Sequence, residues 1–133
     1  MAKPEIRIKS EARMTNELVE KSFDLEERTA RFGEAVIGFS KRVPVTEVTR
    51  ALIPQLVRAG TSIGANYAEA DDCDSRKDFR FKIGLCRREA RETKHWIRML
   101  VAAEPTLRDP ARVIWQEAKE LNPIFGAIRR KTS

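Results

Sequence analysis

The chain has 133 residues, of which 41% are hydrophobic and 35% charged. This length suits one domain with a buried core, and the chain is too apolar to be wholly disordered. No run reaches the ~20 apolar residues of a membrane span, and the first residues lack the apolar stretch of a signal peptide. We therefore expect a cytoplasmic protein without membrane contact, whose two cysteines are reduced thiols.

Residues 1–22 are predicted to form a polar tail, flexible or partly ordered, ahead of a domain at residues 23–133. A first helix is expected to begin with Asp24 as its N-cap and to end before Pro44. Its apolar residues recur at alternating spacings of four and three, which forms one stripe along a helix. The stripe consists of Leu25, Thr29, Phe32, Val36, Phe39 and Val43.

A second helix is expected after Thr46 as N-cap, with a kink or a short break at Pro54. Its stripe consists of Leu52, Leu56, Ala59, Ile63, Asn66 and Ala70. Gly60, Gly64 and Ala68 form a ridge of small residues. Such a ridge allows close helix packing, either within the chain or against a neighbouring subunit.

Ser75 and Asp78 resemble a capping box and predict the start of a third helix. Its buried seam is predicted at Phe79, Ile83, Cys86, Ala90, Thr93, Ile97 and Leu100. A fourth helix is expected from Asp109 as cap and Pro110 as first residue, with a bend at Pro123. Its stripe consists of Ile114, Ala118, Leu121, Phe125 and Ile128. Four stripes with short connections predict an all-α, antiparallel up-and-down four-helix bundle.

Positive charge is concentrated in the third helix. Nine basic and three acidic residues lie between Arg76 and Arg98, so this segment carries +6, the net charge of the whole chain. The candidate nucleic-acid-binding residues form one flank beside the seam: Arg76, Arg80, Arg87, Arg91, Lys94 and Arg98. From Arg80 to Arg98 this flank is about 27 Å long and could follow a phosphate backbone. Alternatively, it is a solvated flank or pairs with glutamates of a neighbouring helix or subunit.

A buried polar network is predicted beside the seam, with Asn66, Glu69, Glu89 and Glu92 as its members. Asn66 and Glu69 are expected to bond to polar side chains of the third helix, with Arg88 or Thr93 as candidates. Paired carboxylates can also serve acid–base chemistry, and Asn66 with Glu69 could line a small-ligand pocket. We favour the structural role, because such networks commonly fix helix register.

Catalytic and metal-binding motifs are not found in the sequence. Cys73, Cys86 and His95 lack the spacing of a metal site, and there is no phosphate loop or nucleophile motif. We therefore expect a non-enzymatic protein that has neither a cofactor nor a bound metal.

The segments FDLEERTARFGEAVIGFSKRV, QLVRAGTSIGANYAEA and SRKDFRFKIGLCRREARETKHWIRML resemble a family of small bacterial four-helix bundle proteins. That family includes proteins encoded by intervening sequences in large-subunit ribosomal RNA genes. The accessory protein of diversity-generating retroelements, which is thought to bind nucleic acid and a reverse transcriptase, is a more distant relative. The resemblance covers roughly residues 23–131. It rests most specifically on a short motif consisting of Ser62, Ile63, Asn66, Ala68 and Glu69.

The resemblance implies a four-helix bundle that assembles as a homo-oligomer, with a five-fold ring as the expected form. Ala70 stands where many relatives have glycine, which predicts a longer second helix. The resemblance and the basic flank together predict an accessory or scaffold protein that binds RNA, DNA or a ribonucleoprotein. The alternative is a protein–protein adaptor whose arginines form intersubunit salt bridges.

Overall fold

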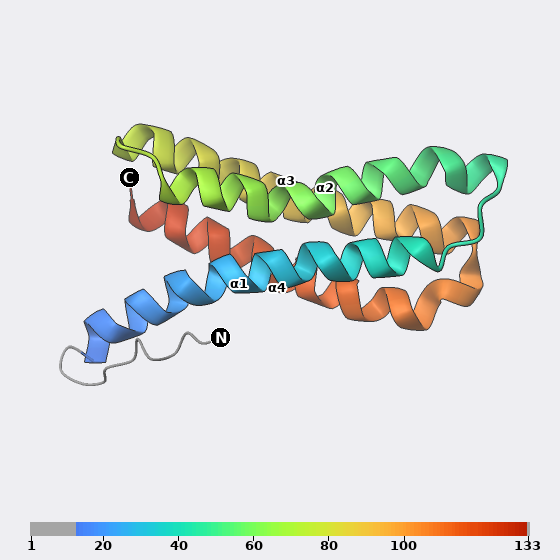
Figure 1. Ribbon diagram of the computed structural model, residues 1–133, viewed down its shortest axis with the longest axis horizontal. Coiled ribbons are helices and arrows are strands. Elements are labelled where there is room, and N and C mark those ends of the chain that lie inside the picture. Colours follow the sequence, from blue (N-terminus) through green and yellow to red (C-terminus); the bar gives the residue numbers. More distant parts are fainter. Residues whose placement is uncertain (1–12, 133) are drawn as a thin grey trace.

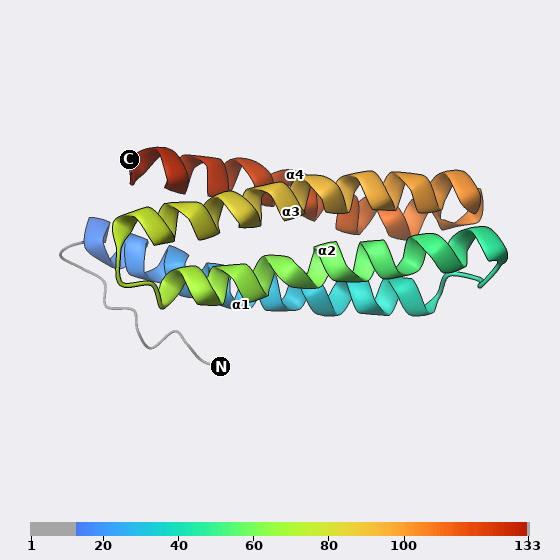
Figure 2. The same cartoon turned by 90° about the horizontal axis from the view of Figure 1, so that it is seen from above.

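The computed structural model describes the backbone of residues 13–132 and the side chains of residues 25–132. Four helices run alternately up and down along one axis (Figure 1), which confirms the all-α four-helix bundle. They are α1 (Arg13–Lys41), α2 (Glu47–Asp71), α3 (Arg76–Ala103) and α4 (Arg108–Lys131), with the 3-10 turn η2 (Pro105–Leu107) before α4. Figure 2 shows α1 and α2 in one layer and α3 and α4 in the other.

Helix α1 begins at Arg13, so the predicted cap at Asp24 is wrong. The intervening sequence, RMTNELVEKSFD, consists mainly of residues that favour helix, and the helix therefore extends toward the N-terminus. Residues 1–12 of the predicted tail lie outside the described residues. The division between tail and domain at residues 22 and 23 stays a prediction.

The start of α2 is the predicted one. The Thr46 hydroxyl accepts a hydrogen bond from the Thr49 N–H (3.1 Å), and the Thr46 N–H donates to the Thr49 hydroxyl (2.8 Å). The helix continues through Pro54 to Asp71, so there is no break at Pro54, and the alternative of a kink stays a prediction. Loss of one backbone hydrogen bond is offset here because Leu56 and Ala59, in the following turn, are fully buried.

The start of α4 differs from the prediction. Turn η2 runs directly into the helix, so Leu107 is the N-cap and Asp109 lies in the first turn. A carboxylate is still favourable there, because it faces the positive end of the helix dipole. Pro110 is also tolerated, since N–H groups of the first turn have no partner within the helix.

The predicted stripes form the core, with one exception. The five stripe residues from Leu25 to Phe39 in α1 are all buried, as is Val43 just after the helix. The central stripe residues of α3 and α4 are buried too. In α2, Asn66 is half-buried and Tyr67 takes the core position, with its ring 6.1 Å from that of Phe125. Asn66 and Tyr67 both fit the alternating spacing of four and three. Tyr67 is buried because its larger, more apolar side chain gains more free energy by leaving water. None of the described helices has the length and apolar character to cross a bilayer.

Part of the small-residue ridge of α2 packs within the chain. A Cβ atom placed on Gly60 would lie 2.7 Å from Val36 Cγ2, and one placed on Gly64 would lie 3.4 Å from the Thr29 hydroxyl oxygen. Both partners are in α1, so glycine lets the two helices approach closely. Ala68, the third member of the ridge, is exposed.

This contact predicts opposite effects for two glycine substitutions. Gly60→Ala should lower the free energy of unfolding by about 1–3 kcal/mol, because the methyl group overpacks against Val36. Gly38→Ala, with nothing within 4 Å of the added atom, should raise it by up to ~1 kcal/mol through helix propensity. Urea denaturation of both variants measures the difference, and equal effects would contradict the close packing.

Candidate nucleic-acid interface

The buried seam of α3 sets which flank of that helix faces which neighbour. The helix starts at Ser75, whose hydroxyl accepts from the Asp78 N–H at 3.0 Å. Its seam is buried from Ile83 to Leu100, while Phe79 at its beginning is half-buried. Because α3 lies between α2 and α4, burial of the seam directs one flank toward each of these two helices.

Carboxylates of α3 lie on the α2 side. Arg58 of α2 donates to Glu89 at 3.4 Å and to Glu92 at 3.0 Å. The Glu89 side chain is only 16% exposed, and this burial raises the pKa of its carboxyl group, although the nearby Arg58 charge opposes the effect. The hydrogen bond to Glu92 is the main cause that raises the pKa of Arg58. One guanidinium therefore binds both carboxyl groups.

The predicted buried network is only partly present. Asn66 donates to the Ser62 carbonyl of its own helix at 3.0 Å, and Thr93 donates to the Glu89 carbonyl. Glu69 does reach α3, but it pairs with Lys82 rather than Arg88 or Thr93, and its side chain is 58% exposed. The prediction of burial is wrong for Glu69, because Glu69 lies on the solvent side of α2, whereas Tyr67 and Ala70 of the same turn face the core.

Two glutamates of α4 form ion pairs with α1 rather than with α3. Arg28 of α1 donates to Glu117 at 2.6 and 3.0 Å and to Glu120 at 3.0 Å. Glu89 and Glu92 of α3 are thus bound to α2, and Glu117 and Glu120 of α4 are bound to α1. The surface between α3 and α4 is left to basic side chains.

The six predicted nucleic-acid-binding residues follow this surface. Arg76, Arg87, Arg91 and Arg98 are exposed, whereas Arg80 and Lys94 are half-buried. Arg80 donates to the Arg129 carbonyl at 3.3 Å, and the Lys94 ammonium lies 5.4 Å from the centre of the Trp115 ring. Within residues 25–132, none of the six forms an ion pair with a carboxylate.

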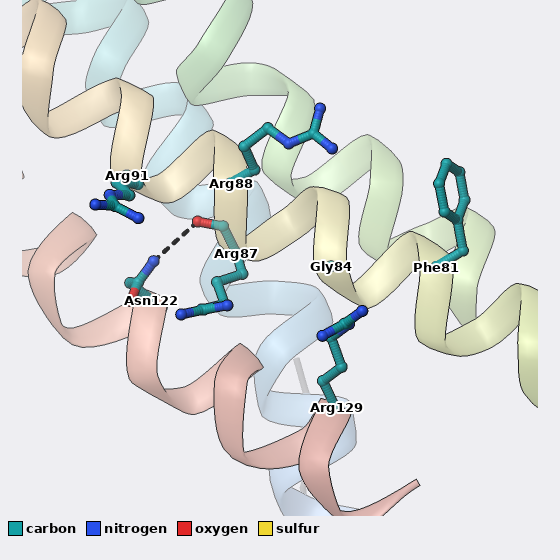
Figure 3. Close-up of a pocket in the computed structure, with 7 residues that line it drawn as sticks. All are labelled: Phe81, Gly84, Arg87, Arg88, Arg91, Asn122 and Arg129. Atoms are coloured by element: carbon teal, nitrogen blue, oxygen red, sulfur yellow. Dashed lines mark hydrogen bonds between the residues drawn. The ribbon is translucent and has the colours of Figure 1, made fainter. Parts of the chain in front are cut away.

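A groove of about 360 Å³ lies on this surface (Figure 3), and we call it the arginine groove. It is lined by Phe81, Gly84, Arg87, Arg88, Arg91, Asn122 and Arg129. Four of these residues are arginines, and none of the described residues that line it is acidic. Figure 3 shows Arg87, Arg91 and Arg129 beside the line where α3 faces α4, while Phe81 and Arg88 project from the other side of α3.

Two glycines shape the groove from opposite sides. A Cβ atom on Gly84 of α3 would lie 3.1 Å from Arg129 Nε, and one on Gly126 of α4 would lie 3.6 Å from Arg87 Nε. Each arginine therefore lies across the glycine of the facing helix. The packed stems restrict both guanidinium groups, which lowers the entropy lost when they bind an anion.

The sequence analysis did not assign five of the seven groove residues to this site: Phe81, Gly84, Arg88, Asn122 and Arg129. Asn122 donates to the Arg87 carbonyl at 3.0 Å, which joins the two helices, and Arg129 has a buried Nε without a hydrogen-bond partner. Phe81 lies outside the seam and is 60% exposed. Antiparallel pairing of α3 with α4 was predicted. The spacing of Gly126 and Arg129 in α4 could therefore have indicated which residues of α4 face α3. The exposure of Phe81 could not be recognised as functional without the groove.

The described residues hold no group of three acidic, histidine or cysteine side chains that could bind a metal ion. Cys86 is fully buried, and this burial raises its pKa to about 12. Its Sγ atom donates weakly to the Ile63 carbonyl at 3.6 Å. Cys86 is thus a core side chain, as its place in the seam predicted.

Fold and surface together define a four-helix bundle with a cationic face between its third and fourth helices. The chain belongs to the 23S rRNA-intervening sequence protein family, whose model matches residues 21–126. This confirms the family to which the sequence motifs pointed.

A solved structure supports the same assignment. It is a protein with unknown function from the S23 ribosomal protein family of Bacteroides thetaiotaomicron VPI-5482, and it is 29% identical to this chain. The match covers 83% of this chain and 98% of the other, with a TM-score of 0.74. A search of curated proteins gives no match.

Burial of Glu89 predicts a pH effect on stability. Its pKa is raised in the folded protein, so the group binds more protons folded than unfolded. Its contribution to stability is therefore fully present below the ordinary value of 4.5 and is lost as the pH rises through the raised value. The free energy of unfolding of the wild type minus that of Glu89→Gln should therefore be larger at pH 4 than at pH 7.

Urea denaturation at both pH values measures this difference, and Glu27→Gln, on an exposed pair of α1, controls for loss of one carboxylate. If the free energy of unfolding of the wild type minus that of Glu89→Gln is larger at pH 7 than at pH 4, the charge of Arg58 affects the pKa of Glu89 more than burial does.

Proposed function

We propose that this protein is a non-enzymatic, cytoplasmic accessory or scaffold protein that binds RNA, alone or in a ribonucleoprotein, through the face between α3 and α4. The observation that carries the proposal is the arginine groove, in which four guanidinium groups lie without an acidic neighbour among the described lining residues. Other described arginines, such as Arg28 and Arg58, are paired with carboxylates of adjacent helices.

Like charges held close together repel one another, and an anion relieves that repulsion. Phosphate groups suit this site, because a guanidinium can donate two parallel hydrogen bonds to phosphate oxygens. Binding to a polyanion also releases its condensed counterions, so the affinity falls as the salt concentration rises. For about four phosphate contacts on a single strand, the slope of log K against log salt should be about −3.

The family assignment favours RNA over DNA as the polyanion. The family takes its name from intervening sequences of 23S rRNA. None of the described elements is a zinc finger or a β-sheet that could read base edges. Recognition through the phosphate backbone fits this architecture.

We also propose a homo-oligomer, with the five-fold ring that the family resemblance implies. Large apolar side chains remain exposed on the single chain, including Val113 at 71% and Val45 at 63%. Association of subunits would cover such side chains. In a ring, each subunit would present one arginine groove, and linked grooves would bind one long RNA far more tightly than a single groove.

Charge reversal in the groove tests the RNA-binding function. We expect Arg87→Glu with Arg91→Glu to weaken binding of a labelled 12-nucleotide RNA at least 100-fold. The slope of log K against log salt should also become less steep by about 1.4, because two phosphate contacts are lost. Fluorescence anisotropy at several salt concentrations measures both quantities.

The matched control is Arg31→Glu with Arg112→Glu, which changes the net charge equally at arginines that pair within their own helices. The control should bind RNA with an affinity within a few-fold of the wild type. Equal losses in both double variants would show a general charge effect. The adaptor function would be supported instead by two results together. The wild type would show no salt-dependent RNA binding, and the double variant Arg87→Glu/Arg91→Glu would form a smaller oligomer than the wild type.

A further inference from the structure

We infer that the arginine groove binds an unpaired nucleic-acid strand, and that one base of this strand stacks on the ring of Phe81. The inference rests on the proposed function and names the form of nucleic acid that the site selects. Two features carry it. The exposed ring of Phe81 lines a groove that is otherwise polar and cationic, and the groove crosses α3 at Gly84, which has no side chain.

Phe81 lies on the same helix as three of the groove arginines. It precedes Gly84 by one turn and Arg88 by two turns, so about 10 Å of helix separates Phe81 from Arg88. Figure 3 shows Phe81 and Arg88 on one side of α3 and Arg87, Arg91 and Arg129 on the other, with Gly84 between them. A strand whose phosphates contact the arginines beside α4 can therefore cross α3 over Gly84, where the Arg129 guanidinium lies, and bring a base to Phe81.

A single exposed phenylalanine is common on protein surfaces and needs no function by itself. The setting of Phe81 is what distinguishes it from the exposed Val45, Val48 and Val113, which do not line the arginine groove. Trp115, the aromatic residue further along the α3–α4 face, has the ammonium groups of Lys94 and Lys119 over its ring, each 5.4 Å from the ring centre. Phe81 is thus the aromatic ring available for stacking.

Stacking distinguishes unpaired from paired strands. Every base has a flat face, so contact with an aromatic ring tolerates any sequence, and removing the ring typically weakens single-strand binding by roughly 5- to 150-fold. In a duplex the bases are stacked on one another and are not open to Phe81. The arginines, by contrast, contact phosphates of either form.

The test compares one 12-nucleotide RNA as a single strand and as a duplex with its complement. Phe81→Leu keeps an apolar side chain but removes the ring, and Phe81→Trp keeps a ring. We expect Phe81→Leu to bind the single strand at least 5-fold more weakly than the wild type, with unchanged duplex affinity and an unchanged salt slope. Phe81→Trp should retain the wild-type preference, and Val113→Ala, at another exposed apolar residue, should match the wild type.

Other outcomes overturn the inference. If Phe81→Leu binds the single strand as tightly as the wild type, or weakens both forms equally, no base stacks on the ring. If its particle mass in light scattering falls, Phe81 is a contact between subunits instead. The proposed function survives both results as long as Arg87→Glu with Arg91→Glu still abolishes binding, whereas a wild type that binds no RNA contradicts both proposals.

Discussion

Burial of one apolar seam fixes the rotation of α3 about its own axis, and the surface chemistry of the bundle follows from that rotation. With Ile83 to Leu100 turned inward, Glu89 and Glu92 come beside α2, where Arg58 binds both. The arginines on the other flank come beside α4. A rotation of α3 by one residue, about 100°, would bury charged side chains at a cost of several kcal/mol, so the seam and the charge distribution are set together.

The cationic face arises because acidic residues are drawn to the other faces of the bundle. Arg28 holds Glu117 and Glu120 of α4 on the side of α1, just as Arg58 holds the acids of α3 on the side of α2. Exposed ion pairs of this kind add little stability individually. Their consequence is electrostatic: these four glutamates are held away from the arginine groove, and none of its described lining residues is acidic.

The core and the basic flank could be predicted because periodicity and charge are properties of one helix at a time. The groove could not, because it depends on which residues of α4 face α3: Arg129 across Gly84 and Asn122 beside Arg87. Asn66 shows the same limit within α2. Asn66 and Tyr67 fit the stripe spacing equally well, and only packing against Phe125 selects Tyr67.

The central claim is that no carboxylate neutralises the positive charge of the groove arginines. Nitrogen-15 NMR of arginine Nε–H groups tests it directly, by following exchange with water before and after addition of a short RNA. In the free protein, Arg28, whose Nε–H donates to Glu117, should exchange slowly and Arg87 and Arg91 fast, and RNA should slow only the latter pair. Slow exchange of Arg87 and Arg91 in the free protein, unchanged by RNA, would contradict the account.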